Sequence, residues 1–203
     1  MKRVIRCGVF ETNSSSMHSI VVTKNDVADE DYFESYLSCS KKLHLYEDDL
    51  EFGRSPFEVL STARRKFEYA IASFLGDAVY EHLSKDGEPD EHLKGMMESF
   101  DSLASSVFDG CKGVEYPGKL NELSFGFIDH DSSRLLQRFL KIEDISLEEF
   151  IKNPKYIVVI DGDEYCVFNS MKKAGLIREE DIVKEVCNDD YFYSFTHEED
   201  KKL

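Results

Sequence analysis

The sequence predicts an α+β fold, with a mixed sheet built from N-terminal and C-terminal strands and a helical insertion at about residues 55–108. Two observations predict it. Short runs rich in β-branched and aromatic residues, which are typical of strands, lie near both ends of the chain. Apolar residues at helical spacing fill the middle. The 203 residues are 41% hydrophobic and include 11 Gly and 4 Pro, so a single domain over 1–203 is expected.

The N-terminal part begins with two predicted strands, residues 4–10 and 18–23, on either side of a string of small polar residues. Residues 25–36 are acidic but carry aromatic side chains at helical spacing, which predicts a short surface helix. The alternating segment KLHLY, residues 42–46, predicts an edge strand.

The first long helix is predicted from the segment SPFE. Ser55 can cap the helix, Pro56 suits its first position, and Glu58 completes an S-x-x-E capping box. A stripe at helical spacing follows, which is apolar except for Arg64: Phe57, Leu60, Phe67, Ile71, Phe74 and Leu75. This helix continues through or breaks near Gly76. A second helix is predicted over about 90–107, with these residues inward: Leu93, Met96, Met97, Phe100, Leu103 and Val107.

Short elements alternate in the C-terminal half. LSFGFID predicts a strand, SSRLLQRFL a helix that begins at a serine cap, and SLEEFI a helix capped by Ser146. KYIVVIDGDEYCVF predicts two strands joined by a tight turn at Asp161, Gly162 and Asp163. A helix from Asn169 to Gly175, a last strand in DYFYSF and a frayed tail at about 196–203 complete the prediction.

Charge and cysteine content restrict the class of protein. Asp and Glu number 41 against 25 Lys and Arg, a net charge of −16, which argues against direct binding to nucleic acid or to a membrane surface. The sequence lacks a signal-peptide h-region and an apolar run of about 18 residues. Its five cysteines form no C-x-x-C pair. A cytoplasmic protein is therefore expected.

The segment ETNSSSMHS, residues 11–19, is the first candidate site. A loop of small polar residues offers hydroxyl, amide and N–H donors that suit a phosphate, a carboxylate or a sugar. His18 suits acid–base work near neutral pH and Ser15 is a candidate nucleophile. The candidate ligand-binding residues here are Arg6, Glu11, Asn13, Ser14 and Ser16. The alternative is an ordinary polar turn between two strands.

A second polar cluster follows the predicted strand LSFGFI. Asp129 and His130 can hold a divalent metal or orient a general base, and Ser132 is a further ligand-binding candidate. The alternative is helix capping by Asp131 or Ser132. Asp161 and Asp163 are explained first by their turn. The other histidines are expected to be isolated, at helix surfaces, on an edge strand or in the tail, and are assigned no ligand role: His44, His82, His92 and His197.

The segment GVFETNSSSMHSIVV resembles the opening of a group of uncharacterised bacteriophage and Gram-positive bacterial proteins that begin G-x-F-E-T-N-S-S-S-x-H-S. The group also has a D-H-x-S segment, matched here by IDHDSS, and a glycine-aspartate turn after an apolar strand, matched by VVIDGDEY. The middle helices are not covered. The resemblance implies a shared site and a phage or mobile-element type of protein, and it names no activity.

The sequence therefore predicts a polar pocket that binds a phosphate-bearing or other anionic small ligand, with phosphoester hydrolysis or transfer as its chemistry if it is an enzyme. A divalent metal is compatible with the residues, although no cofactor is identified. The rival hypothesis is an acidic inhibitor that mimics nucleic acid and binds a basic host protein that handles DNA or RNA. A third is an accessory component whose serine loop is architectural.

Overall fold

The computed structural model describes residues 17–27, 40–46, 50–52, 58–116, 120, 125–128, 132–161 and 179–187. Helices and strands are both present, so the predicted α+β class is confirmed. The strands are β1 (Met17–Thr23), β2 (Leu43–His44), β3 (Glu51–Phe52), β4 (Glu58–Leu60), β5 (Val114–Glu115), β6 (Phe127–Ile128), β7 (Tyr156–Asp161) and β8 (Ile182–Cys187). The helices are α1 (Ala63–His82), α2 (Glu91–Val107), α3 (Leu135–Glu143), α4 (Leu147–Lys152) and a 3-10 turn at Glu179–Asp181.

The main sheet has four strands in the order β4-β7-β1-β8, and neighbouring strands are antiparallel. β1 lies between β7 and β8, so strands from the two ends of the chain share a sheet, as the sequence predicts. Parallel pairing occurs in two small sheets, β2 with β5 and β3 with β6.

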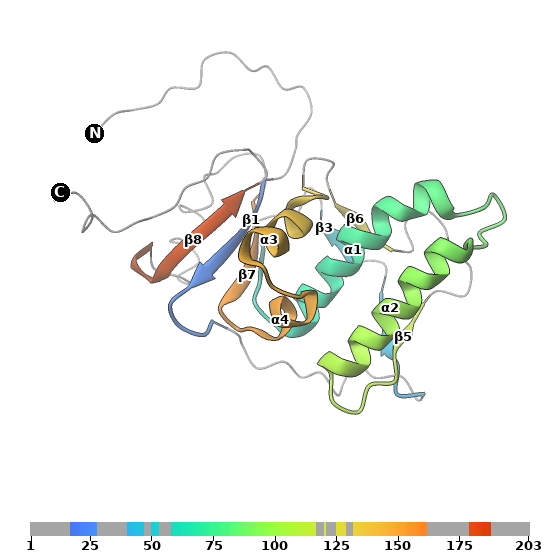
Figure 1. Cartoon of the computed structure of the whole chain (residues 1–203), viewed down its shortest axis with the longest axis horizontal. Coiled ribbons are helices and arrows are strands. Elements are labelled where there is room, and N and C mark those ends of the chain that lie inside the picture. The colour runs from blue at the N-terminus through green and yellow to red at the C-terminus, as the bar shows by residue number, and fades with distance from the viewer. Residues whose placement is uncertain are drawn as a thin grey trace, which may run out of the picture.

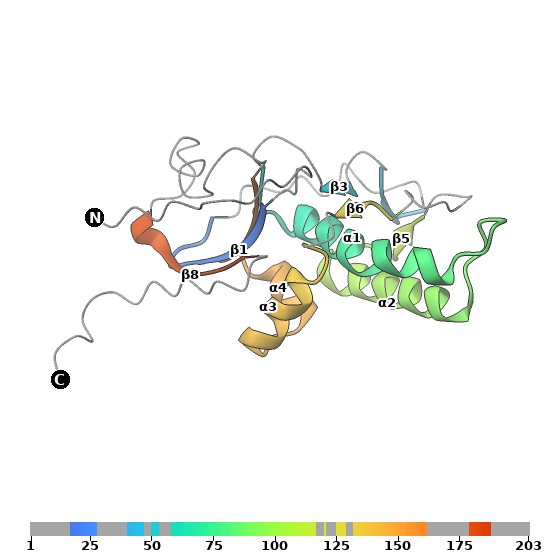
Figure 2. The same cartoon turned by 90° about the horizontal axis from the view of Figure 1, so that it is seen from above.

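Helices α3 and α4 lie against one face of the main sheet, where α3 contacts β1 and β8. Figures 1 and 2 show α3 and α4 on the same side of β1 and β7, with the antiparallel pair α1 and α2 extending away from the sheet. α1 packs against α2, α4, β3 and β6, which makes it the centre of the hydrophobic core. Fully buried core side chains include Ile20, Phe52, Leu60, Phe67, Ile71 and Phe139. Among the described residues, no helix combines the length and apolarity needed to cross a membrane.

Several predicted elements are confirmed. β1 and β7 form where strands are predicted, at 18–23 and in KYIVVI, and β2 lies within KLHLY. β7 extends through Asp161, which the sequence analysis assigned to the following turn. α2 begins after Asp90, whose side chain accepts hydrogen bonds from the N–H groups of His92 and Leu93. α4 begins after Ser146, which caps the N–H of Glu149 at 3.1 Å. α1 runs through Gly76 without a break.

The predicted start of the first helix is wrong. The segment of Glu58 and Leu60 forms strand β4, and α1 begins at Ala63 with Thr62 as its N-cap. Glu58 lies in this strand and therefore cannot complete a capping box, and its carboxylate pairs with Arg65 of α1 at 2.5 Å. Pairing with β7 and this ion pair outweigh the local capping signal.

The predicted serine cap of the next helix is also wrong. α3 begins at Leu135 with Arg134 as its N-cap residue, and no side chain of the described residues caps it. Ser132 and Ser133 form a turn before the helix. The Ser132 carbonyl accepts a hydrogen bond from the Leu135 N–H, and the Ser133 carbonyl accepts one from Ser73.

Other predictions differ in extent or lie outside the described residues. β6 is shorter than LSFGFID, and β8 is a strand that the sequence analysis did not predict. Of the helix predicted over 25–36, residues 25–27 are described and are not helical. The elements predicted at 4–10, 164–168, 169–175 and 190–195 and the frayed tail lie outside the described residues.

Gly126 tests the close packing of β6 against β3. Its φ is +85°, and a Cβ built there would lie 2.2 Å from the Leu50 carbonyl oxygen. We expect Gly126→Ala to lower the free energy of unfolding by about 2 kcal/mol or more, from backbone strain and overpacking. The matched control is Gly95→Ala in α2, where no described atom lies within 4 Å of the new Cβ. It should gain about 0.5–1 kcal/mol from helix propensity. Urea unfolding of both variants measures the difference, and equal stabilities would contradict this packing.

Glu185 tests the burial of an acid in β8. Its side chain is 2% exposed, and burial raises the pKa of its carboxyl above the ordinary value of 4.5. The folded state therefore favours the protonated carboxyl of Glu185. The free energy of unfolding decreases as the pH rises above the pKa that Glu185 has in the unfolded chain. We expect Glu185→Gln to melt at a higher temperature than wild type at pH 7.5 and at the same temperature near pH 4. Exposed Glu98 provides the control, because Glu98→Gln should show no such pH dependence.

Candidate functional site

The inner face of α1 carries polar side chains that are rare in protein interiors. Glu68, Tyr69 and Ser73 are fully buried, and Arg64 and Lys66 are almost so. Charged groups are seldom fully buried unless they are paired, so each of these residues needs a defined partner. Their partners lie on the sheet, on α4 and in the turn before α3, and two of them belong to the motifs singled out in the sequence.

His18 is held by Tyr69. His18 is on the same face of β1 as Ile20, which is the face toward α1, and its side chain has no exposed area. His18 Nδ1 and the Tyr69 hydroxyl lie 3.0 Å apart in a hydrogen bond. Burial raises the pKa of Tyr69, so its hydroxyl keeps its proton at neutral pH. The Tyr69 ring also packs edge-on against Phe52, which fixes its own position.

The segment with Ser132 is held by the next turn of α1. Ser73 donates its hydroxyl to the Ser133 carbonyl at 2.8 Å, and Ser132 is fully buried. Ser73 follows Tyr69 by four residues, so the two side chains are neighbours on one face of the helix. The described ends of the opening motif and of the D-H-x-S segment therefore contact adjacent positions of α1.

A charge network lies one turn before Tyr69. Arg65 Nη1 donates a hydrogen bond to Glu68 Oε2, and Arg64 Nε forms an ion pair with Glu68 Oε1, both at 2.6 Å. Arg65 also binds Glu58 of β4 and stacks over Phe52 at 5.2 Å. Burial alone would lower the pKa of Arg65, but the hydrogen bond to Glu58 and the charge of Glu68 outweigh it and raise that pKa. Two acids and two guanidinium groups thus balance each other, with Arg64 and Glu68 buried and Arg65 and Glu58 partly exposed.

Lys66 connects α1 to α4. Its Nζ donates to the carbonyls of Phe150 and Asn153, at 3.1 and 2.7 Å, which are at the C-terminal end of α4. Burial lowers the pKa of Lys66 to about 7. Because these carbonyls carry the negative end of the helix dipole, Lys66 serves to dock α4 on the core.

The structure holds one predicted site residue, His18, and Ser133, the neighbour of the predicted site residue Ser132, against the same helix. A third segment leaves the sheet nearby, because Asp161 ends β7 opposite Met17, the first residue of β1. The following predicted residues lie outside the described residues: Arg6, Glu11, Asn13, Ser14, Ser15, Ser16, Asp129, His130 and Asp163. The sequence analysis missed Tyr69 and Ser73. The one sign in the sequence that this helix buries polar groups was Arg64, a charged residue in an otherwise apolar stripe.

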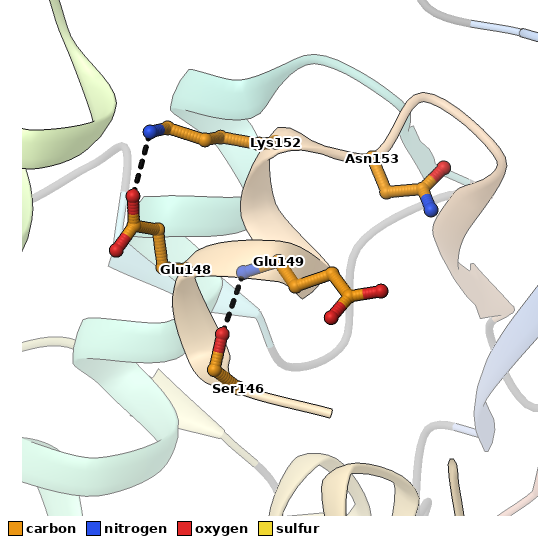
Figure 3. A pocket seen from close by; sticks show the side chains of 5 residues that line it. All are labelled: Ser146, Glu148, Glu149, Lys152 and Asn153. Atoms are coloured by element: carbon orange, nitrogen blue, oxygen red, sulfur yellow. Dashed lines mark hydrogen bonds and ion pairs between the residues drawn. The ribbon is translucent and has the colours of Figure 1, made fainter. Parts of the chain in front are cut away.

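A surface pocket of about 380 Å³ lies at α4, and five polar residues line it: Ser146, Glu148, Glu149, Lys152 and Asn153. Figure 3 shows Glu148 paired with Lys152 on one side of the helix, and Glu149 and Asn153 pointing elsewhere. Ser146 is occupied as the helix cap, and Ser106 donates to Glu148 at 2.6 Å. These groups pair with one another and do not converge on a common point. We therefore assign the pocket no ligand.

Comparisons with known proteins find no matching family model, no similar curated protein and no similar solved structure. The resemblance of the opening motif to the phage and Gram-positive group stays a prediction.

Tyr69→Phe tests the hydrogen bond to His18. The substitution removes one hydroxyl and leaves His18 Nδ1 without this partner in the interior, which should cost about 1–3 kcal/mol of unfolding free energy. Tyr116→Phe is the matched control, because its hydroxyl donates to the Met97 carbonyl at 3.1 Å, away from β1. The imidazole ¹⁵N shifts of His18 should change in Tyr69→Phe and not in Tyr116→Phe. Unchanged shifts in both variants would show that the pair does not form in solution.

Proposed function

We propose that this chain is a cytoplasmic protein that binds a small phosphate-bearing or other anionic ligand in a polar pocket formed by its two hydrophilic motifs. One observation carries the proposal. Tyr69 and Ser73, one helical turn apart on α1, hold His18 and Ser133, which are the described ends of the two motifs. Segments far apart in the sequence are thereby anchored on one buried helical face.

The chemistry of the motifs supports an anionic ligand. The loop with Ser14, Ser15 and Ser16 supplies hydroxyl and N–H donors, which suit phosphate oxygens. The described arginines of α1 already pair with Glu58 and Glu68. In this proposal the attractive charge therefore comes from Arg6, which leads into the loop.

Because His18 is buried, we assign different roles to His18 and His130. A fully buried imidazole held by Tyr69 is suited to positioning the loop that follows it in the site. Proton transfer then belongs to His130 with Asp129, which can also hold a divalent cation. In the phosphoester reaction, the hydroxyl of Ser15 or a water forms a bond to phosphorus while His130 takes its proton. The P–O bond to the ester oxygen breaks, and that oxygen leaves with the bonding electrons and takes the proton from His130.

The experiment is a thermal-shift titration of the full chain with inorganic phosphate and nucleoside mono-, di- and triphosphates, with and without Mg²⁺ or Mn²⁺. At least one ligand should raise the melting temperature of wild type, because a ligand that binds the folded state stabilises it. Ser15→Ala should abolish the shift, and Tyr69→Phe should weaken it by about tenfold in apparent Kd. Tyr116→Phe should keep the wild-type Kd. The proposal fails if no ligand shifts wild type, which is the result that the nucleic-acid-mimic hypothesis expects.

A further inference from the structure

Two histidines that look isolated in the sequence lie side by side at the tip of the α1–α2 pair. His82 is the last residue of α1 and His92 is the second residue of α2. Their ring centroids are 4.4 Å apart, with the rings tilted by 46°. The antiparallel arrangement of the helices, visible in Figure 1, closes the ten-residue gap between them. The prediction that these two residues stand alone is therefore wrong.

Asp90 fixes the geometry of this tip. Its N–H donates to the His82 carbonyl at 2.9 Å, and its Oδ1 accepts from the N–H groups of His92 and Leu93. Its other oxygen, Oδ2, accepts a hydrogen bond from His82 Nδ1 at 2.8 Å.

This hydrogen bond decides which nitrogen of His82 is available to a ligand. An ionised carboxylate can only accept, so the ring proton of neutral His82 is on Nδ1 and the lone pair is on Nε2. A histidine whose Nδ1–H is held by a carboxylate is the usual arrangement of a metal-binding imidazole. Glu81 Oε2 lies 3.9 Å from that Nε2, close to the ~3.3 Å that separates two ligand atoms on a tetrahedral zinc ion.

We propose that His82 Nε2, His92 and Glu81 form a binding site for a divalent transition-metal ion of the zinc type, with Asp90 orienting His82. Two imidazoles and a carboxylate are ligands that such ions prefer over Mg²⁺ or Ca²⁺. The local charge favours a cation, because residues 81–94 contain five acids and two lysines. Within the described ranges, no group of three His, Cys, Asp or Glu side chains could hold a metal ion in its present arrangement. The site forms by rotation of exposed side chains, since Glu81 is 81% exposed and His92 is also exposed.

The probe is Zn²⁺ alone, titrated into the full chain by isothermal calorimetry under reducing conditions, with Mg²⁺ in parallel. Wild type should bind Zn²⁺ with a Kd below about 100 µM and should not bind Mg²⁺ in that range. His92→Gln and Glu81→Gln should each weaken the Zn²⁺ site by at least about tenfold. Both side chains are exposed, so these variants should keep the wild-type melting temperature without metal.

The variant Asp90→Asn tests whether Asp90 acts by orienting the His82 ring, since Asp90 is not itself one of the proposed metal ligands. Asparagine is as good an N-cap as aspartate, so α2 keeps its start. An amide that donates to His82 Nδ1 instead moves the ring proton to Nε2, which should again weaken Zn²⁺ binding by about tenfold. His44→Gln is the matched control, because His44 pairs with Glu115 at 3.3 Å in another part of the structure. Its Kd for Zn²⁺ should equal that of wild type.

Visible absorption of bound Co²⁺ gives a second measurement of metal binding that does not depend on calorimetry. Co²⁺ in place of Zn²⁺ should produce visible absorption bands in wild type and lose them in His92→Gln. The proposal is overturned if wild type binds no Zn²⁺ below 100 µM, or if His92→Gln and Glu81→Gln bind it as wild type does. Neither result bears on anion binding, which is tested with phosphate and nucleotides as probes and with variants of Ser15 and Tyr69.

Discussion

The fully buried carboxylate of Glu68 constrains how α1 can lie on the sheet. An uncompensated charge in the interior costs several kcal/mol, so Glu68 must keep both Arg64 and Arg65 beside it. Arg65 in turn reaches Glu58 on β4, which ties the helix to the edge of the sheet. With its rotation fixed in this way, α1 points Tyr69 and Ser73 inward, toward β1 and toward the turn before α3. The ion network therefore determines which segments meet at the candidate site.

Elements whose signals are local were predictable from the sequence. Asp90 and Ser146 cap α2 and α4 through their own side chains, and the β-branched runs of β1 and β7 form strands as expected. The start of α1 was not predictable in this way. The segment SPFE contains a complete capping-box pattern. In the structure, however, Glu58 forms an ion pair with Arg65, and its strand pairs with β7. Such tertiary gains do not appear in a window of the sequence.

The same distinction applies to the functional residues. His18 was recognisable because it ends a dense polar motif, whereas Tyr69 and Ser73 are unremarkable residues in a long helix until their partners are known. His82 and His92 were overlooked because ten positions separate them and the turn between the helices brings them together. In each case residue type suggested chemistry, and long-range packing decided which groups act together.

The position of β1 in the sheet has a consequence for biosynthesis. Its hydrogen-bonding partners, β7 and β8, are encoded near the other end of the sequence. At about 5–20 residues per second, the ribosome needs roughly ten to thirty seconds to supply the roughly 160 residues between β1 and β8. During that interval the apolar strand containing Ile20 and Val21 has unsatisfied edges, which is when chaperones would be most useful to the nascent chain.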